Sequence, residues 1–216
     1  MNIDFARTQM IDQQVRAWDV FDPDVLHVLE TVPREKFVPD KYRALAFADV
    51  EIPLGHQEVM LTPTFAGRIL QALELDGTET VLDVGTGSGF LAACLATLAD
   101  KVTSIDIHDD FLQRATRNLD NAGISNVDLV EMDATAELPE GTFDAIAVTG
   151  SLENFDPRFV EALHPGGKLF IVVGKAPLME ARVVERTSDH DWRSSTIFET
   201  NLRPLLHGSR PPQFIF

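Results

Sequence analysis

The sequence has a single cysteine and no long apolar segment. These two features exclude a protein stabilised by internal disulfides and a protein with a membrane-spanning helix. Cys94 lies in the apolar run FLAACLATLA and has no partner for an internal disulfide, so we expect a small buried residue there. No apolar stretch approaches the roughly 20 residues that cross a bilayer. The first residues, MNIDFARTQM, lack the basic start and apolar centre of a signal peptide. These features favour a cytoplasmic protein with no membrane partner.

Basic residues are also scarce. The chain of 216 residues has 18 Lys and Arg against 34 Asp and Glu, which gives a net charge of −16. A phosphate backbone would be repelled by this balance, so we expect no nucleic-acid partner. The histidines are scattered, and none combines with a cysteine in the spacing of a metal site, so we expect no bound metal.

The first part of the chain is predicted to be mainly helical. Residues 4–18 and 62–75 have apolar side chains at helical spacing. A third helix is expected over 23–32, where Asp22 is placed to cap the first turn and Pro23 occupies its first position. We therefore expect residues 1–78 to form a helical region before the core.

Strands and helices then alternate. The predicted strands are 80–85, 101–107, 126–133, 143–150 and 168–174, and the predicted helices are 88–99, 109–123 and 156–167. This order predicts an α/β fold with a Rossmann-like, doubly wound and mainly parallel sheet. Residues 179–206 alternate polar and apolar side chains, which predicts a C-terminal antiparallel hairpin. We expect one domain over 1–216, with the α/β core at 79–175, which the motifs below mark as the ligand-binding part, and C-terminal strands at 176–216.

A glycine-rich loop follows the first predicted strand, in VLDVGTGSGF. Gly85, Gly87 and Gly89 allow a sharp turn and let a ligand approach the backbone. The dinucleotide fingerprint G-x-G-x-x-G would need a glycine at the position of Phe90. The loop therefore indicates a nucleotide-like ligand other than a dinucleotide.

Three aspartates at the ends of successive strands identify that ligand. Asp83 would repel a pyrophosphate but suits the ammonium group of S-adenosylmethionine. Asp106 is placed to bind two ribose hydroxyls. Asp133 could accept a hydrogen bond from the adenine amino group, with the Ala134 amide beside it. Each aspartate alone fits a helix cap or a solvated strand end, but together with the glycine loop they predict an S-adenosylmethionine site.

The cofactor site is expected to draw on the loop before the core as well as on the strand ends. We predict that it comprises Met60, Leu61, Asp83, Gly85, Thr86, Gly87, Ser88, Gly89, Asp106, Ile107, Asp133, Ala134 and Thr149. The loop GHQEVMLTP, residues 55–63, is expected to lie against the methionine end of the cofactor. Its apolar residues VML would then pack over the ligand and exclude water.

Several longer segments resemble one family. VPREKFVP, AFADVEIPLG, VLDVGTGSGFLAACLA, FDAIAVTGS and LHPGGKLFIVVG are similar to successive motifs of the protein-L-isoaspartate O-methyltransferases. The glycine loop and the Pro-Gly-Gly motif occur in many class I methyltransferases, whereas the N-terminal block is specific. The resemblance implies a Rossmann-like methyltransferase domain with added N-terminal helices. It also implies methyl transfer to the carboxylate of isoaspartyl residues in damaged proteins.

One position departs from the family pattern. The family has a segment close to G-Q-T-I-S-Q-P, whose serine has a role at the active site. The aligned segment here is QEVMLTP, in which Leu61 stands at the serine position and Thr62 follows it. A carboxylate acceptor is already ionised and needs no general base. A phenol, amine or alcohol acceptor could use one, which makes His56, Glu58 and the hydroxyl of Thr62 the catalytic candidates.

Three hypotheses remain open at this point. The first is an isoaspartyl carboxyl methyltransferase that works with Leu61 at the serine position. The second is a methyltransferase on the same scaffold with a smaller or less polar acceptor. The third is a protein that binds S-adenosylmethionine without catalysing a reaction.

Overall fold

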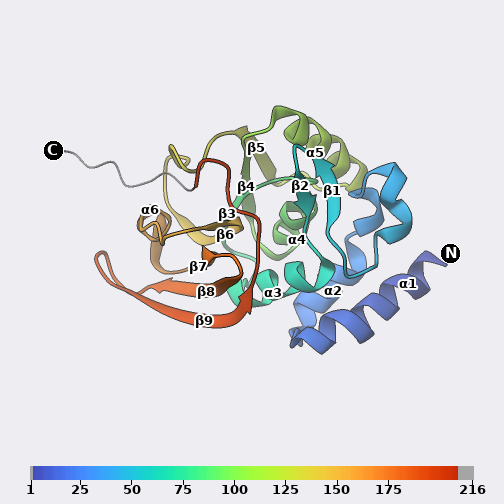
Figure 1. Ribbon diagram of the computed structural model, residues 1–216, viewed down its shortest axis with the longest axis horizontal. Helices are drawn as coiled ribbons and strands as arrows, with labels where there is room; N and C mark the ends of the chain where they lie inside the picture. The colour runs from blue at the N-terminus through green and yellow to red at the C-terminus, as the bar shows by residue number, and fades with distance from the viewer. Residues whose placement is uncertain (1, 209–216) are drawn as a thin grey trace.

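The computed structural model describes residues 2–208. Its central sheet has the strand order β5-β4-β3-β6-β7-β8-β9 (Figure 1). The strands are β3 (Thr80–Val84), β4 (Lys101–Asp106), β5 (Val127–Glu131), β6 (Phe143–Leu152), β7 (Leu163–Lys175), β8 (Leu178–Arg186) and β9 (Trp192–Thr200). The first five strands in this order (β5, β4, β3, β6 and β7) run parallel to one another, and β8 and β9 are antiparallel to their neighbours. The predicted α/β sheet and its C-terminal antiparallel hairpin are confirmed.

Helices cover both faces of the sheet. Successive residues of a strand point to opposite sides, so a strand of apolar residues has side chains on both faces to bury. On β3, Val81 packs into the cluster formed with the N-terminal helices, whereas Leu82 packs into the cluster on the other face. The first face carries α2 (Pro23–Thr31), α3 (Pro63–Leu73), α4 (Phe90–Leu98) and α5 (Asp109–Ala122). The other face carries the short α6 (Arg158–Glu161). Cys94 is buried in the first cluster, as expected, and burial raises the pKa of its thiol.

The N-terminal region is helical but irregular. It begins with α1 (Ile3–Met10), a π-helical turn η1 (Ile11–Val15) and a 3₁₀ turn η2 (Arg16–Trp18). After α2 come two further 3₁₀ segments, η3 (Arg34–Lys36) and η4 (Asp40–Leu45). The cap predicted for α2 is present, since the Asp22 carboxylate accepts hydrogen bonds from the backbone N–H groups of Asp24 and Val25. The continuous helix predicted over 4–18 is wrong in detail, because a wider turn interrupts it. No helix within residues 2–208 combines the length and apolarity that a membrane span requires.

The segment predicted as a loop before α3 is instead a β-hairpin. Strands β1 (Ile52–Gly55) and β2 (Glu58–Met60) pair antiparallel. Its turn places His56 and Gln57 in the left-handed region, with φ of 50° and 64°. Such turns ordinarily use Gly or Asn at these two positions, so no local pattern predicts a hairpin here.

The helix predicted over 156–167 is much shorter than expected. It ends at Glu161, and the Pro-Gly-Gly segment already belongs to β7. Close packing explains this, because a Cβ on Gly167 would lie 2.8 Å from the carbonyl oxygen of Asp144. The glycine thus lets β7 approach β6 at its beginning.

Candidate active site

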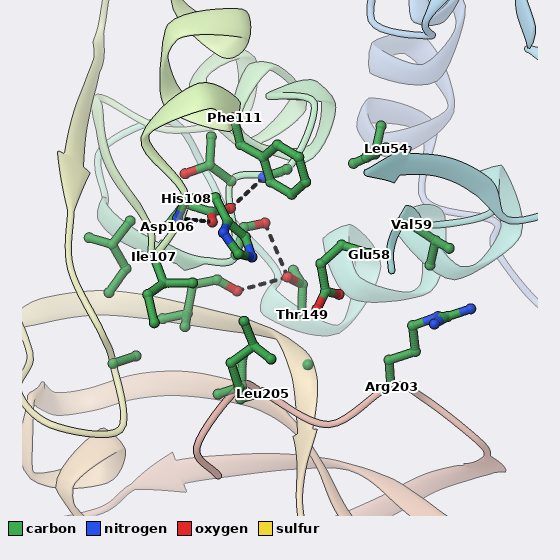
Figure 2. A pocket seen from close by; sticks show the side chains of 18 of the residues that line it. Leu54, Glu58, Val59, Asp106, Ile107, His108, Phe111, Thr149, Arg203 and Leu205 are labelled. Atoms are coloured by element: carbon green, nitrogen blue, oxygen red, sulfur yellow. Dashed lines mark hydrogen bonds between the residues drawn. The ribbon is translucent and has the colours of Figure 1, made fainter. Parts of the chain in front are cut away.

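A cavity lies at the carboxyl ends of β3, β4 and β6, where open α/β sheets bind their ligands (Figure 2). It holds about 1040 Å³, including the part open to solvent. Its walls come from the β1–β2 hairpin, the glycine loop, the start of α5 and the segment 202–206. All the predicted cofactor residues line this cavity except Asp83 and Gly89. Among the catalytic candidates, Glu58 lines it, whereas His56 and Thr62 do not.

The glycine loop is shaped by close packing within the chain. Gly85 has a φ of +101°, and a Cβ at this position would lie 2.3 Å from the hydroxyl oxygen of Thr149. A Cβ on Gly89 would lie 3.0 Å from the Cβ of Ala115 on α5. These glycines are therefore required by the packing of the fold itself.

Asp106 is held rigidly at the end of β4. Its two carboxylate oxygens accept hydrogen bonds from the backbone N–H groups of Gly87 and His108, at 2.9 and 3.0 Å. The side chain is 8% exposed, and burial raises its pKa, while these N–H groups act in the opposite direction. Each oxygen retains a second lone pair, so the carboxylate can accept from the two hydroxyls of a ribose.

Asp83 lies beneath the loop and is fully buried. Ser104 donates a hydrogen bond to one of its oxygens at 2.7 Å, and the hydroxyls of Ser104 and Thr86 are also 2.7 Å apart. The other carboxylate oxygen of Asp83 has no partner. Burial raises the pKa of Asp83 to about 7. Its position supports the loop from below, and the predicted contact with a ligand's ammonium group stays a prediction.

Asp133 has partners on both oxygens. One oxygen accepts from the backbone N–H and the hydroxyl of Thr135, at 2.9 and 2.6 Å. The other lies 2.7 Å from Nδ1 of His207. Although burial raises the pKa of Asp133, the hydrogen bonds from Thr135 and His207 bring it below its ordinary value. The His207 partner comes from the segment after β9, and no motif of the sequence predicts it.

The tip of the hairpin docks on α5. The imidazole rings of His56 and His108 are stacked with centroids 4.1 Å apart, and Phe111 meets both edge-on. Nε2 of His56 lies 3.0 Å from an Asp110 oxygen. The two rings and Asp110 bring metal-ligating atoms within 4.8 Å of one another. The rings are nearly parallel, however, so their lone pairs do not converge on one point. His56 therefore serves to fasten the hairpin.

Glu58, on β2, is half-buried and lines the cavity. Burial raises the pKa of its carboxyl, while His108 and Arg203 act in the opposite direction. Thr62, by contrast, is the N-cap of α3. Its oxygen accepts a hydrogen bond from the N–H of Phe65 at 3.2 Å. The hydroxyl of Thr62 is thus used to start a helix.

Leu61 lines the cavity, and its backbone is fixed by a buried arginine. Arg34 is 1% exposed and donates to the carbonyl oxygens of Leu61 and Ala46, at 2.6 and 2.8 Å. Its guanidinium lies 4.7 Å from the centre of the Phe90 ring. Burial lowers the pKa of Arg34 to about 10. Through Arg34, the motif VPREKFVP fixes the backbone of a residue in the cavity wall, and the sequence alone does not predict this contact.

The last wall comes from the segment after β9. Its backbone lies beside the end of β6, where Ser151 donates to the carbonyl oxygen of Arg203 at 2.8 Å and accepts from the N–H of Leu205 at 2.9 Å. The Arg203 side chain reaches across to the hairpin and donates to the carbonyl oxygen of Gln57 at 2.6 Å. The β1–β2 hairpin and the segment 202–206 therefore both border the cavity, and the hydrogen bond from Arg203 to Gln57 links them.

Comparisons with known proteins agree with this architecture. Residues 6–209 match the family model described as protein-L-isoaspartate(D-aspartate) O-methyltransferase. A relative from Opitutus terrae, named protein-L-isoaspartate O-methyltransferase, is 38% identical over 97% of this chain and 85% of its own length. A relative of the same name from Geobacter metallireducens is 37% identical over 81% of each chain.

A solved structure shows the same fold. The isoaspartate O-methyltransferase of Plasmodium falciparum, crystallised with S-adenosyl-L-homocysteine, has a TM-score of 0.78 over 95% of this chain and 98% of its own. Its sequence identity is 19%, so this likeness concerns the fold. The family match and the two relatives establish more: the chain belongs to the protein-L-isoaspartate(D-aspartate) O-methyltransferase family.

Proposed function

We propose that this protein methylates the free carboxylate of isoaspartyl residues in proteins and peptides, which is the α-carboxylate because the peptide bond runs through the side chain. Membership of the family makes it an S-adenosylmethionine-dependent O-methyltransferase. The observation that best supports the proposed acceptor is the family match over residues 6–209, because it includes the hairpin and the segment 202–206 that border the cavity.

The residues of the cavity fit the cofactor. Asp106 offers a rigid carboxylate for the ribose hydroxyls. Asp133 and the backbone of Ala134 lie on the same cavity wall, where they can face the adenine. Glu58 adds a third carboxylate to this lining, and a cationic ligand without phosphates matches such a charge.

When bound, S-adenosylmethionine supplies an electrophilic methyl group on a sulfonium. The chain aligns the acceptor oxygen with that group and excludes water from its path. Met60, Leu61 and Leu205 provide apolar surface for this purpose. An isoaspartyl carboxylate is ionised at neutral pH, so the reaction needs no side chain that removes a proton. This agrees with His56 and Thr62 lying outside the cavity lining.

A direct assay tests the acceptor. The purified protein should transfer a methyl group to a peptide with one isoaspartyl residue, and not to the same peptide with an ordinary aspartyl residue. Binding of S-adenosyl-L-homocysteine by calorimetry is the control for an intact site. Cofactor binding without transfer to the isoaspartyl peptide would reject the proposed acceptor.

Leu61 favours a second candidate, a methyltransferase with a less polar acceptor. Leu61 lines the cavity, and the sequence pattern predicts the family's serine at this position. The variant Leu61→Ser separates the two candidates. Isoaspartyl methylation that is absent in the wild type and appears in this variant would support the second candidate. Similar activity in both proteins would support the first.

The remaining expectations are proposals of the same kind. A protein that binds the cofactor without turnover on any acceptor would fit the third hypothesis, in which the fold serves for binding alone. We further propose a cytoplasmic location without nucleic-acid or membrane partners, in line with the net charge of −16. Cell fractionation tests the location, and a shift assay with single- and double-stranded nucleic acid tests the partner.

A further inference from the structure

The charged groups of the cavity are unevenly distributed. Glu58, Asp106 and Asp133 contribute three carboxylates to its lining. Within residues 2–208, Arg203 is the one arginine in that lining, and no lysine joins it. A carboxylate acceptor must therefore enter a cavity whose acidic groups repel it. His108 also lines the cavity, but among the lining residues that the structure describes Arg203 is the permanently charged cation that can offset this repulsion.

Two of the three carboxylates are committed to other partners. Asp106 accepts from two backbone N–H groups, and Asp133 is bound to Thr135 and His207. Glu58 is the third; burial raises the pKa of its carboxyl, while the charges of His108 and Arg203 act in the opposite direction. Arg203 and Glu58 approach the cavity from different segments, one after β9 and one on the hairpin (Figure 2).

Arg203 is held in place on the cavity wall. Its carbonyl oxygen accepts from Ser151, and its side chain donates to the carbonyl oxygen of Gln57. That oxygen is presented by the hairpin turn, in which Gln57 has a φ of 64°. A guanidinium has five N–H donors in a planar fork, and this contact uses one of its nitrogens. The other nitrogens can bind a carboxylate without a large loss of side-chain freedom.

The location also suits the acceptor. Asp106, expected at the ribose, lies on the opposite side of the cavity from Arg203 (Figure 2). With the ribose at Asp106, the methionine end of the cofactor would lie toward the hairpin and the segment 202–206. An acceptor oxygen that meets the methyl group must arrive at this end.

We infer that Arg203 binds the carboxylate of the methyl acceptor and so determines specificity for anionic acceptors. The inference rests on the proposed function, since it assumes a carboxylate acceptor. Arg203 orients one carboxylate oxygen toward the methyl group while its guanidinium offsets the charge of Glu58. It is a specificity residue for the acceptor and takes no part in binding the cofactor.

The test uses Arg203→Gln in the full chain, with an isoaspartyl peptide as acceptor. Loss of a hydrogen-bonded charge should raise the KM for this peptide at least about tenfold. The affinity for S-adenosyl-L-homocysteine should change less than about twofold. Arg203→Lys keeps the charge but loses the fork, and it should have an intermediate KM. Arg117→Gln removes the same charge from an exposed position on α5 and should behave as wild type.

A second readout separates carboxylate binding from a merely structural contact with the hairpin. The competitor is the same peptide with its isoaspartyl carboxylate replaced by a carboxamide. Arg203→Gln should weaken the binding of the isoaspartyl peptide and leave that of the carboxamide peptide unchanged. Equal weakening of both peptides would assign Arg203 to holding the hairpin and would overturn the inference.

The other outcomes are also decisive. An active wild type with identical KM values for Arg203→Gln and Arg117→Gln would overturn the inference and leave the proposed function intact. Weakened S-adenosyl-L-homocysteine binding in Arg203→Gln would place Arg203 at the cofactor and overturn it as well. A wild type that binds the cofactor but does not methylate the isoaspartyl peptide would reject both the proposed function and the inference.

Discussion

The hydroxyl of Thr149 occupies the space beside Gly85 in which a Cβ would lie. It donates a hydrogen bond to the carbonyl oxygen of Val84 at 2.7 Å, and a Cβ on Gly85 would be 2.3 Å from its oxygen. The end of β6 thus locks the first turn of the glycine loop. The conformation of this loop is set by the protein before any ligand arrives.

Gly85→Ala should therefore lower the free energy of unfolding by more than about 2 kcal/mol, through a clash and an unfavourable φ. Chemical denaturation measures this. Gly77→Ala is the matched control, because Gly77 has a φ of +103° and nothing within 4 Å of its Cβ position. It isolates backbone strain, which costs about 1 kcal/mol. Adding Thr149→Ala to Gly85→Ala should recover part of the loss, and no recovery would contradict the proposed clash.

Asp83 should make stability depend on pH. Its pKa is raised from 3.8 to about 7 in the folded protein, so folding favours the protonated carboxyl. Its stabilising effect is present below about pH 4 and is lost as the pH rises through about 7. The free energy of unfolding of the wild type, relative to Asp83→Asn, should fall over this range. Denaturation of both proteins at pH 5, 6, 7 and 8 checks the trend, and a flat difference would refute it.

Thr62 should matter for stability through its cap. Thr62→Ala removes the acceptor for the N–H of Phe65 and should cost about 1 kcal/mol. Thr62→Ser keeps the acceptor and should match the wild type. The two variants should have the same kcat per folded molecule. A lower kcat in Thr62→Ala alone would show that the hydroxyl has a catalytic role.

Arg34 should be intolerant even of lysine. Lysine keeps the charge, but its single ammonium cannot reproduce the fork that reaches both Leu61 and Ala46. A buried charge left with fewer partners costs about 3 kcal/mol or more. Arg34→Lys should therefore lower the free energy of unfolding by this amount. Arg16→Lys, on the exposed side of the N-terminal region, is the control and should change stability by less than about 0.5 kcal/mol.

Much of the fold could be predicted from local patterns. The strands of the core, the cap at Asp22 and the start of α3 after Thr62 follow from hydrophobic periodicity and capping chemistry. The β1–β2 hairpin was missed because its turn uses His56 and Gln57 at left-handed positions. The shortened α6 was missed because the close approach of Gly167 to Asp144 is a tertiary contact.

The candidate site was predicted in part, for a similar reason. Strand order places Asp106 and Asp133 at one edge of the sheet, so the sequence alone brings them together. Arg34, Arg203 and His207 reach the site through contacts between distant segments, and no local pattern marks such residues. The position of Asp83 beneath the loop depends on the direction of one side chain, which the spacing of the motif does not specify.

The contact between Arg203 and Gln57 joins residues 146 positions apart. Bringing such distant segments together requires a large loss of chain entropy, so we expect this contact to form late during folding. An intermediate with the parallel strands in place would have a sheet but an open cavity. Ligand binding would then stabilise the finished protein far more than that intermediate, and so make the last step of folding harder to reverse.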